Sequence, residues 1–144
     1  MLQPLSLPNR IKKFYERVSV ERGSALVDLG ALYGDDVHFI NPVVDQQGLA
    51  AFRGAWDTAL RKYKVFQFHD IEVSGTDEHF ALNYSMTVSF GFGPSFKTDM
   101  ATVCRASDGK VVFLRDYFDP MGSLVQPFGP VNWLYRKVFG VLVA

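Results

Sequence analysis

One acidic residue near the end of the chain, Asp116, has surroundings that suit proton transfer. In the last predicted strand, alternation places its side chain on the same face as Leu114 and Phe118. A carboxylate among bulky apolar side chains is costly to ionise, so we expect a raised pKa, which suits a general acid or base. The alternative is structural: Asp116 accepts hydrogen bonds from Asn41, Tyr15 or a neighbouring strand and only fixes the sheet.

Around Asp116 we expect a pocket with apolar walls and a few polar groups, as is typical of a small-molecule site. We expect Tyr15, on the first predicted helix, or Asn41, after a short strand, to orient a substrate beside Asp116. The other residues expected to line this pocket are Phe39, Trp56, Asn83, Ser85, Met100, Leu114 and Phe118.

Two function classes fit such a pocket. The first is an enzyme that isomerises, hydrates or hydrolyses a small lipophilic molecule, with Asp116 as acid or base. The second is a noncatalytic carrier or sensor of a hydrophobic ligand, which uses the same cavity without proton transfer. A third class, a protein-interaction module, leaves the polar group on the pocket face unexplained.

The remaining residues with reactive side chains are scattered. The histidines His38, His69 and His79 form no pair at i, i+4 and have no accompanying Cys or Glu cluster, so we expect no metal site and no cofactor. The single cysteine, Cys104, lies in an apolar stretch and is expected to be a buried core residue.

Composition limits the class of protein. The chain has 144 residues, about the length of one domain. Lys plus Arg and Asp plus Glu each number 15, which gives zero net charge and argues against nucleic-acid binding. No stretch approaches the roughly 18 apolar residues of a membrane span, and the segment Met1–Pro4 does not begin a signal peptide, so we expect a cytoplasmic protein.

Helical periodicity dominates the first part of the chain. Apolar residues recur at helical spacing over Ile11–Val18, Ala25–Tyr33 and Leu49–Tyr63, so three helices are expected there. Gly34 is placed to end the second helix, and a short strand is expected over Val37–Ile40.

From Lys64 onward the apolar period changes to two, which predicts strands. The clearest strand covers Phe80–Phe90, a second returns over Phe96–Arg105, and a last one covers Lys110–Asp119 after the Asp108–Gly109 turn. Together with the helices, these strands predict an α+β domain with a mostly antiparallel sheet.

The last predicted strand is apolar on both faces, with Val112 on the face of Asp116 and Val111 on the other. A strand of this kind needs cover on both sides, and the predicted helices can cover only one. We therefore expect a homodimer through the outer sheet face, with Arg115 and Tyr117 as contacts.

The tail forms a separate unit, so we divide the chain into a domain over 1–126 and an amphipathic helix over 127–144. One interpretation packs this helix over the open end of the domain. The other is peripheral contact with a membrane surface, because Trp133, Arg136 and Lys137 accompany the apolar stripe. The stripe consists of Val131, Leu134, Tyr135, Val138 and Leu142.

Three helices followed by a curved antiparallel sheet resemble the nuclear transport factor two-like fold, also called SnoaL-like or cystatin-like. The run Gly109–Asp119 resembles the final strand of limonene epoxide hydrolase and its bacterial relatives, most sharply over Arg115–Asp119. The run Leu32–Pro42 resembles the junction between the second helix and the sheet in that superfamily. The resemblance implies a cone in which helices close one face of a bent sheet around an apolar pocket, while the outer face often dimerises.

The resemblance to limonene epoxide hydrolase implies a role for Asp116 in an Asp-Arg-Asp triad that activates water and protonates the epoxide. An ungapped count places the other two members at Asn83 and Ser85, which cannot replace a charge or transfer that proton. The pocket Asn of that family corresponds to Asn41, whereas its nearby Tyr corresponds to Phe39.

The resemblance to ketosteroid isomerase is also incomplete. The general base of that family is the Asp of an Asp-Pro pair, and the matching pair here is Asn41–Pro42, whose amide cannot abstract a proton. Tyr15 falls near the position of its oxyanion-hole Tyr, but the second oxyanion donor falls near Ala101 or Thr102. Isomerase, hydrolase and noncatalytic binding therefore all stay open.

Overall fold

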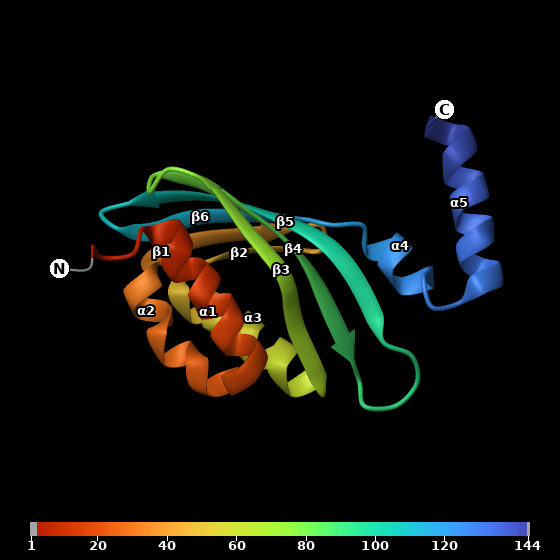
Figure 1. Cartoon of the computed structure of the whole chain (residues 1–144), viewed down its shortest axis with the longest axis horizontal. Helices are drawn as coiled ribbons and strands as arrows, with labels where there is room; N and C mark the ends of the chain where they lie inside the picture. The colour runs from red at the N-terminus through yellow and green to blue at the C-terminus, as the bar shows by residue number, and fades with distance from the viewer. Residues whose placement is uncertain (1–2, 144) are drawn as a thin grey trace.

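The computed structural model describes residues 3–143, and its helices lie mainly on one face of a six-stranded sheet (Figure 1). Met1 and Leu2, which belong to the segment considered for a signal peptide, are outside the described residues. The elements in chain order are α1 (Leu7–Glu21), the 3-10 helix η1 (Arg22–Asp28), α2 (Leu29–Leu32), β1 (Tyr33–Asn41), β2 (Val44–Gln47), α3 (Leu49–Lys62), β3 (Val65–Gly75), β4 (His79–Ser89), β5 (Phe96–Ser107), β6 (Lys110–Tyr117), α4 (Pro120–Val125) and α5 (Gly129–Val143).

The first helix follows the predicted periodicity. Pro8 lies in its first turn, where a missing N–H breaks no helical hydrogen bond. Its apolar stripe, which includes Ile11, Phe14 and Val18, is buried against the rest of the domain. The same spacing places Tyr15 inside, so α1 positions one of the candidate site residues.

The second predicted helix is shorter than its apolar pattern indicates. The chain first winds as the 3-10 helix η1 and completes only one α-helical turn in α2. Tyr33 then pairs with Val111 in β6, so β1 begins at Tyr33. Gly34, expected to end a helix, therefore lies within a strand.

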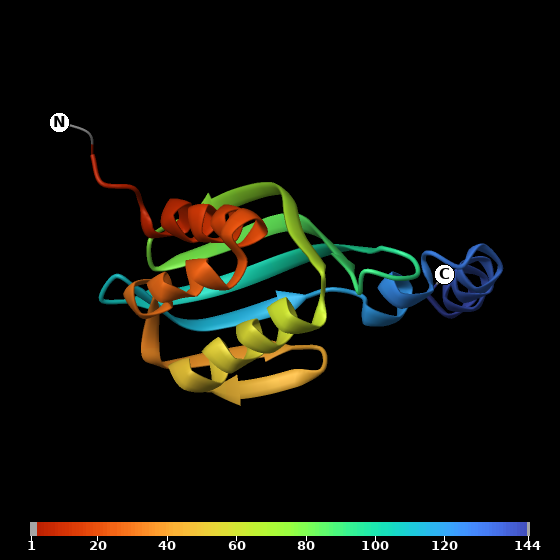
Figure 2. The same cartoon turned by 90° about the horizontal axis from the view of Figure 1, so that it is seen from below.

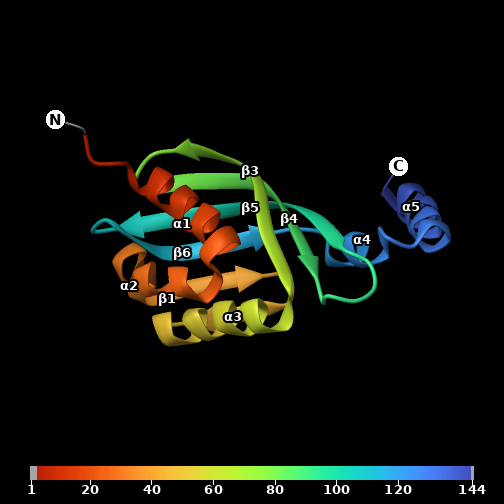
Figure 3. The same cartoon turned by 60° about the horizontal axis from the view of Figure 1, so that its bottom comes forward.

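The sheet has the strand order β2-β1-β6-β5-β4-β3. All neighbouring strands are antiparallel except β1 and β6, which are parallel. Figure 2 and Figure 3 show α1, α2 and α3 lying across one face of this curved sheet. The expected α+β architecture with a mostly antiparallel sheet is confirmed. The edge strand β2 was not predicted, because its four residues are too few and too polar for a periodic signal.

Three register shifts interrupt the sheet: one lies between Tyr33 and His38 in the pairing of β1 with β6, and the other two bear on the predictions. The pairing of β5 with β6 shifts between Arg105 and Ala106, and this bulge reverses the alternation expected in β6. Val111 is consequently buried, whereas Val112 is 39% exposed, so the predicted faces of these two valines were wrong.

The second irregularity lies in the edge strand β3. Its pairing with β4 shifts between His69 and Glu72, and Asp70 adopts a positive φ of 53°. This bulge bends β3, which lies at one border of the sheet.

The outer face of the sheet is not covered by helices α1 to α3 (Figure 3). Val103 and Tyr117 are exposed there, and the Arg105 guanidinium lies over the Phe113 ring at 4.5 Å from its centroid. The homodimer expected through this face stays a prediction.

The C-terminal segment differs from its first interpretation. Helix α5 forms from Gly129 as expected, but none of its side chains is buried, and it projects from the domain (Figure 1). It contacts α4, where Asp119 accepts hydrogen bonds from the Gly122 backbone N–H and the Tyr135 hydroxyl. The prediction that it packs over the open end of the domain was therefore wrong. No helix within residues 3–143 is long and apolar enough to cross a bilayer.

Candidate functional site

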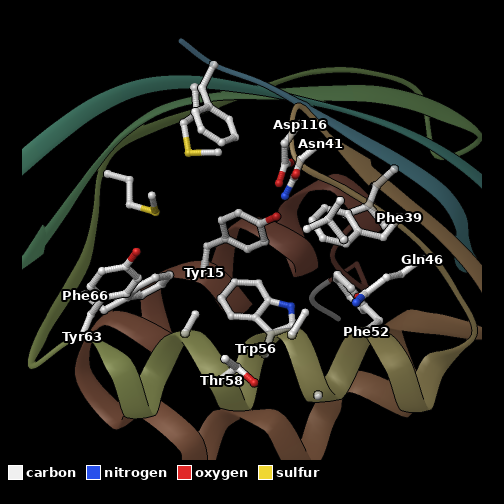
Figure 4. Close-up of a pocket in the computed structure, with 18 of the residues that line it drawn as sticks. Tyr15, Phe39, Asn41, Gln46, Phe52, Trp56, Thr58, Tyr63, Phe66 and Asp116 are labelled. Carbon is white, nitrogen blue, oxygen red and sulfur yellow. The ribbon is translucent and has the colours of Figure 1, made fainter. Parts of the chain in front are cut away.

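A cavity of about 630 Å³ lies between the inner face of the sheet and helices α1 and α3 (Figure 4). Most of its wall is aromatic or aliphatic, with a few polar side chains among them. The lining residues are Tyr15, Phe39, Asn41, Val44, Gln46, Ala51, Phe52, Gly54, Ala55, Trp56, Thr58, Ala59, Lys62, Tyr63, Phe66, Phe68, Tyr84, Met86, Met100, Leu114, Asp116 and Phe118.

Asp116 is held by a short chain of hydroxyl groups. The Thr102 hydroxyl donates a hydrogen bond of 2.5 Å to Asp116 Oδ1. The Tyr84 hydroxyl lies 2.8 Å from Thr102 Oγ1, and because the one proton of Thr102 goes to the carboxylate, Tyr84 is the donor in this second bond. Within residues 3–143, no other side-chain hydrogen bond to the Asp116 carboxyl group is found. One carboxyl oxygen is therefore left for a ligand.

The surroundings of Asp116 raise its affinity for a proton. Its side chain is partly exposed, toward the cavity, but its carboxyl group lies among apolar side chains such as Leu114 and Phe118. Burial raises the pKa of Asp116 to about 6, and the hydrogen bond from Thr102 opposes this rise. The group can thus exchange a proton close to neutral pH.

Tyr15 and Asn41 face Asp116 from two other elements (Figure 4). Burial raises the pKa of the Tyr15 hydroxyl well above its usual value, with further contributions from Tyr84, Tyr33 and Asp116. Tyr15 consequently stays protonated and can donate a hydrogen bond. Asn41 Oδ1 accepts the Val43 backbone N–H at 2.9 Å, which leaves its NH2 group for a ligand.

A second polar position lies beside Trp56 and Gln46. Trp56 Nε1 and Gln46 Oε1 are buried and have no hydrogen-bond partner within the described part of the chain. Both residues line the cavity, so a donor and an acceptor are available there as well. Gln46 was missed at the sequence level because β2 itself was not predicted.

Two residues expected in the pocket are not there. Asn83 and Ser85 are absent from the lining because β4 turns the alternate residues, Tyr84 and Met86, toward the cavity. Ser85 instead donates a 2.6 Å hydrogen bond to exposed Asp99. The prediction that Asn83 and Ser85 line the pocket was therefore wrong.

The structure brings the other predicted site residues together. Asp116, Tyr15 and Asn41 share one cavity with Phe39, Trp56, Met100, Leu114 and Phe118. Sequence reasoning missed Phe66 and Phe68, although their spacing of two in β3 was available as a signal.

Aromatic rings form much of the cavity wall. The ring of Tyr15 lies 4.8 Å from that of Phe68 and 5.7 Å from that of Trp56, measured between centroids. Tyr84 meets both Tyr15 and Phe68 edge to face. Such contacts fix ring orientations and provide a rigid, apolar wall for a ligand.

Residues 3–143 contain no group of three or more His, Cys, Asp or Glu side chains that could hold a metal ion. Cys104 is buried, as predicted, and burial raises the pKa of its thiol, which makes it a poor nucleophile.

Solved structures with the same architecture come from several bacteria. A proposed polyketide cyclase from Pseudomonas putida KT2440 is 18% identical with a TM-score of 0.70, covering 85% of this chain and 98% of that one. A hypothetical protein with a ketosteroid isomerase-like fold from Catenulispora acidiphila, in complex with trimethylamine, is 16% identical with a TM-score of 0.70 and coverages of 88% and 97%.

A proposed polyketide cyclase from Xanthomonas campestris is 18% identical with a TM-score of 0.66, covering 81% of this chain and 95% of that one. At such identities, these similarities show a shared fold alone. No curated protein matches the sequence. A family model described as the SnoaL-like domain matches residues 11–114. Since that segment is most of the chain, the protein belongs to the SnoaL-like family, and its fold is NTF2-like.

Proposed function

We propose that the protein binds a small lipophilic carbonyl compound in this cavity and isomerises it, with Asp116 as the group that moves the proton. The observation that carries the proposal is the Asp116 carboxyl group, which faces an apolar cavity and has a pKa of about 6. A carboxylate with that pKa is mostly ionised at neutral pH and is a stronger base than an ordinary Asp.

The proposed reaction needs no second reactant. Asp116 takes a proton from the carbon next to the carbonyl, and the electrons of the broken C–H bond move into the carbonyl group to give an enolate. Tyr15 donates a hydrogen bond to the enolate oxygen, and the Asn41 NH2 group supplies a second donor. In a β,γ-unsaturated carbonyl compound this enolate is conjugated with the C=C bond, so Asp116 can return the proton to the γ carbon. The C=C bond then lies between the α and β carbons, which completes the isomerisation.

Epoxide hydrolysis is less well supported than isomerisation. It would need an acid and a base that act together around a water molecule. The positions assigned to the other triad members, Asn83 and Ser85, lie outside the cavity lining.

A noncatalytic carrier or sensor of a hydrophobic ligand is the second candidate. The observation that favours it is that Asp116 is the only acidic residue in the cavity lining of the described chain. The carrier hypothesis uses the same apolar wall and the same donors, but no proton transfer.

The experiment that separates these functions is hydrogen exchange on a panel of cyclic ketones and enones. The protein is incubated with each compound in D2O, and loss of the α-proton signal is followed by NMR. We expect exchange for at least one compound, reduced about 100-fold or more in Asp116→Asn. The rate should rise with pH and level off above about 6, as the base ionises.

The matched control is Asp99→Asn, because Asp99 is an exposed carboxylate bonded to Ser85 and lies outside the cavity lining. This variant should exchange protons as fast as the natural protein. Compounds that bind but exchange no faster than in buffer would contradict catalysis and favour the carrier.

A further inference from the structure

The tail of the chain carries a large apolar surface that the domain does not cover. Helices α4 and α5 project from one end of the sheet (Figure 1), and no side chain of either helix is buried. Trp133 is 62% exposed, although a soluble domain normally shields most of an indole ring. The other exposed apolar residues of this segment are Met121, Leu124, Phe128, Val131, Leu134, Val138, Phe139, Val141, Leu142 and Val143.

The side chains of α5 are sorted by polarity around the helix. At about 100° per residue, Val131, Leu134 and Val138 share one face. Arg136 lies on the opposite side, and Lys137 beside it places its Nζ 5.8 Å from the centroid of the Trp133 ring. An apolar face opposed by cations is typical of a helix that lies in a membrane interface, and Trp133 lies on the side of the cations.

The charge of this segment identifies what can cover its apolar face. After Asp119 the sequence contains Arg136 and Lys137 but no Asp or Glu. A second copy of the same helix would therefore offer these cations no carboxylate, whereas an anionic lipid surface would neutralise them. Asp119 itself is occupied by the Tyr135 hydroxyl and the Gly122 N–H.

The length of α5 decides how it would meet a bilayer. Its 15 residues span about 22 Å, less than the roughly 30 Å of a hydrocarbon core. The helix can therefore lie along the surface with its apolar face in the acyl boundary, but it is too short to cross.

A second group of exposed apolar side chains lies at the same end of the molecule. In the loop between β4 and β5, the Phe92 side chain is 79% exposed, and its ring is stacked on the ring of Phe90. Lys62, at the end of α3, places its Nζ 5.9 Å from the centroid of the Phe90 ring. Figure 2 and Figure 3 show this loop on the same side as α4 and α5, so apolar and cationic groups recur there.

We propose that helices α4 and α5 bind the surface of an anionic lipid bilayer, with the Val131, Leu134 and Val138 face in the acyl boundary. In this arrangement Arg136 and Lys137 lie on the headgroup side of the helix, where they are attracted to the anionic lipid surface. The proposal does not depend on the function of the cavity.

The test is co-sedimentation of the full chain with phosphatidylcholine vesicles, prepared with or without phosphatidylglycerol. We expect binding to the vesicles that contain phosphatidylglycerol and weaker binding as salt is raised. Val138→Glu should lower the partition coefficient by about tenfold or more. The double variant Arg136→Gln, Lys137→Gln should lower it several-fold and reduce its salt dependence.

The matched control is Val20→Glu, because Val20 is also an exposed valine on a helix but lies in α1. It should bind vesicles as the natural protein does. The proposal is overturned if phosphatidylglycerol does not promote binding, or if Val138→Glu binds as well as Val20→Glu. It is also overturned if, without vesicles, sedimentation shows an oligomer that Val138→Glu alone dissociates, because a second copy then covers the helix.

Discussion

Thr102 and Asp116 lie directly opposite each other on β5 and β6, and the Thr102 hydroxyl donates its proton to the Asp116 carboxylate. Thr102 is fully buried, and Tyr84 donates in turn to its hydroxyl oxygen. Among residues 3–143, the sheet therefore supplies the one side-chain hydrogen bond that favours the ionised form of Asp116. This pair makes the proton affinity of the cavity carboxyl group sensitive to a single hydroxyl.

Replacing Thr102 by Val should raise the pKa of Asp116 above about 6, because the hydrogen bond that opposes the effect of burial is lost. A hydrogen bond to a charged group is worth about 1.5–3 kcal/mol, so the rise should be about one pH unit or more. Carbon-13 NMR titration of the aspartate carboxyl groups measures it. The control is Thr98→Val, which changes another buried threonine of β5. It should leave the pKa of Asp116 unchanged.

Asp116→Asn should change how the free energy of unfolding depends on pH. The pKa of Asp116 is raised from 3.8 to about 6, so the folded protein holds this proton more tightly than the unfolded chain. The resulting stabilisation is complete below about pH 4 and is lost as pH rises through about 6. The loss reaches about 2–3 kcal/mol by neutral pH.

Urea unfolding of both proteins near pH 4 and near pH 7.5 checks this prediction. The asparagine variant should gain in stability relative to the natural protein only at the higher pH. Asp99→Asn should retain the pH dependence of the natural protein. Equal pH dependence in Asp116→Asn and the natural protein would show that this carboxyl group is solvated in solution.

Trp56→Phe should alter the free energy of unfolding by less than about 1.5 kcal/mol, because it keeps an aromatic ring and removes a buried N–H that has no hydrogen-bond partner among residues 3–143. Trp56→Ala should cost about 3–5 kcal/mol, since it deletes the ring that contacts Phe14 and Tyr15. Equilibrium urea unfolding compares the two variants. Similar losses in both would contradict the assignment of an unsatisfied indole N–H.

Gly75→Ala should destabilise the protein by about 2 kcal/mol or more. Gly75 has φ +112°, and an added Cβ would lie 2.4 Å from the His79 carbonyl oxygen, at the turn between β3 and β4. Gly54→Ala is the matched change within α3, where a Cβ meets nothing within 4 Å. It should stabilise the protein by about 1 kcal/mol through helix propensity. Thermal unfolding of both variants checks this: the melting temperature should fall in Gly75→Ala and rise in Gly54→Ala.

Much of the fold could be predicted because its signals are periodic. Helical spacing located Tyr15 on α1, and strand alternation placed Asp116 on the face of Leu114 and Phe118. The same periodicity supplied the order of helices and strands, and the family resemblance inferred from that order is confirmed by the SnoaL-like match.

The errors arise where strand pairing, rather than local pattern, decides the outcome. An ungapped count placed Asn83 and Ser85 in the pocket, although the alternation of β4 turns Tyr84 and Met86 inward. The bulge in β5–β6 pairing, which brings Val111 inside, leaves no mark in the sequence of β6 alone. Likewise, the hydroxyl bonded to Asp116 belongs to a strand partner that only the register identifies.

The bulge in β3 has a consequence for the behaviour of the protein in concentrated solution. A flat border strand presents free backbone groups to which strands of other molecules can add. Here the register shift between His69 and Glu72, with Asp70 in the left-handed region, interrupts the regular row of backbone groups along β3. Asp70 and Glu72 also put negative charges on this strand. The opposite border, β2, is only four residues long. An unclosed sheet is thereby protected at both borders against growth into fibres.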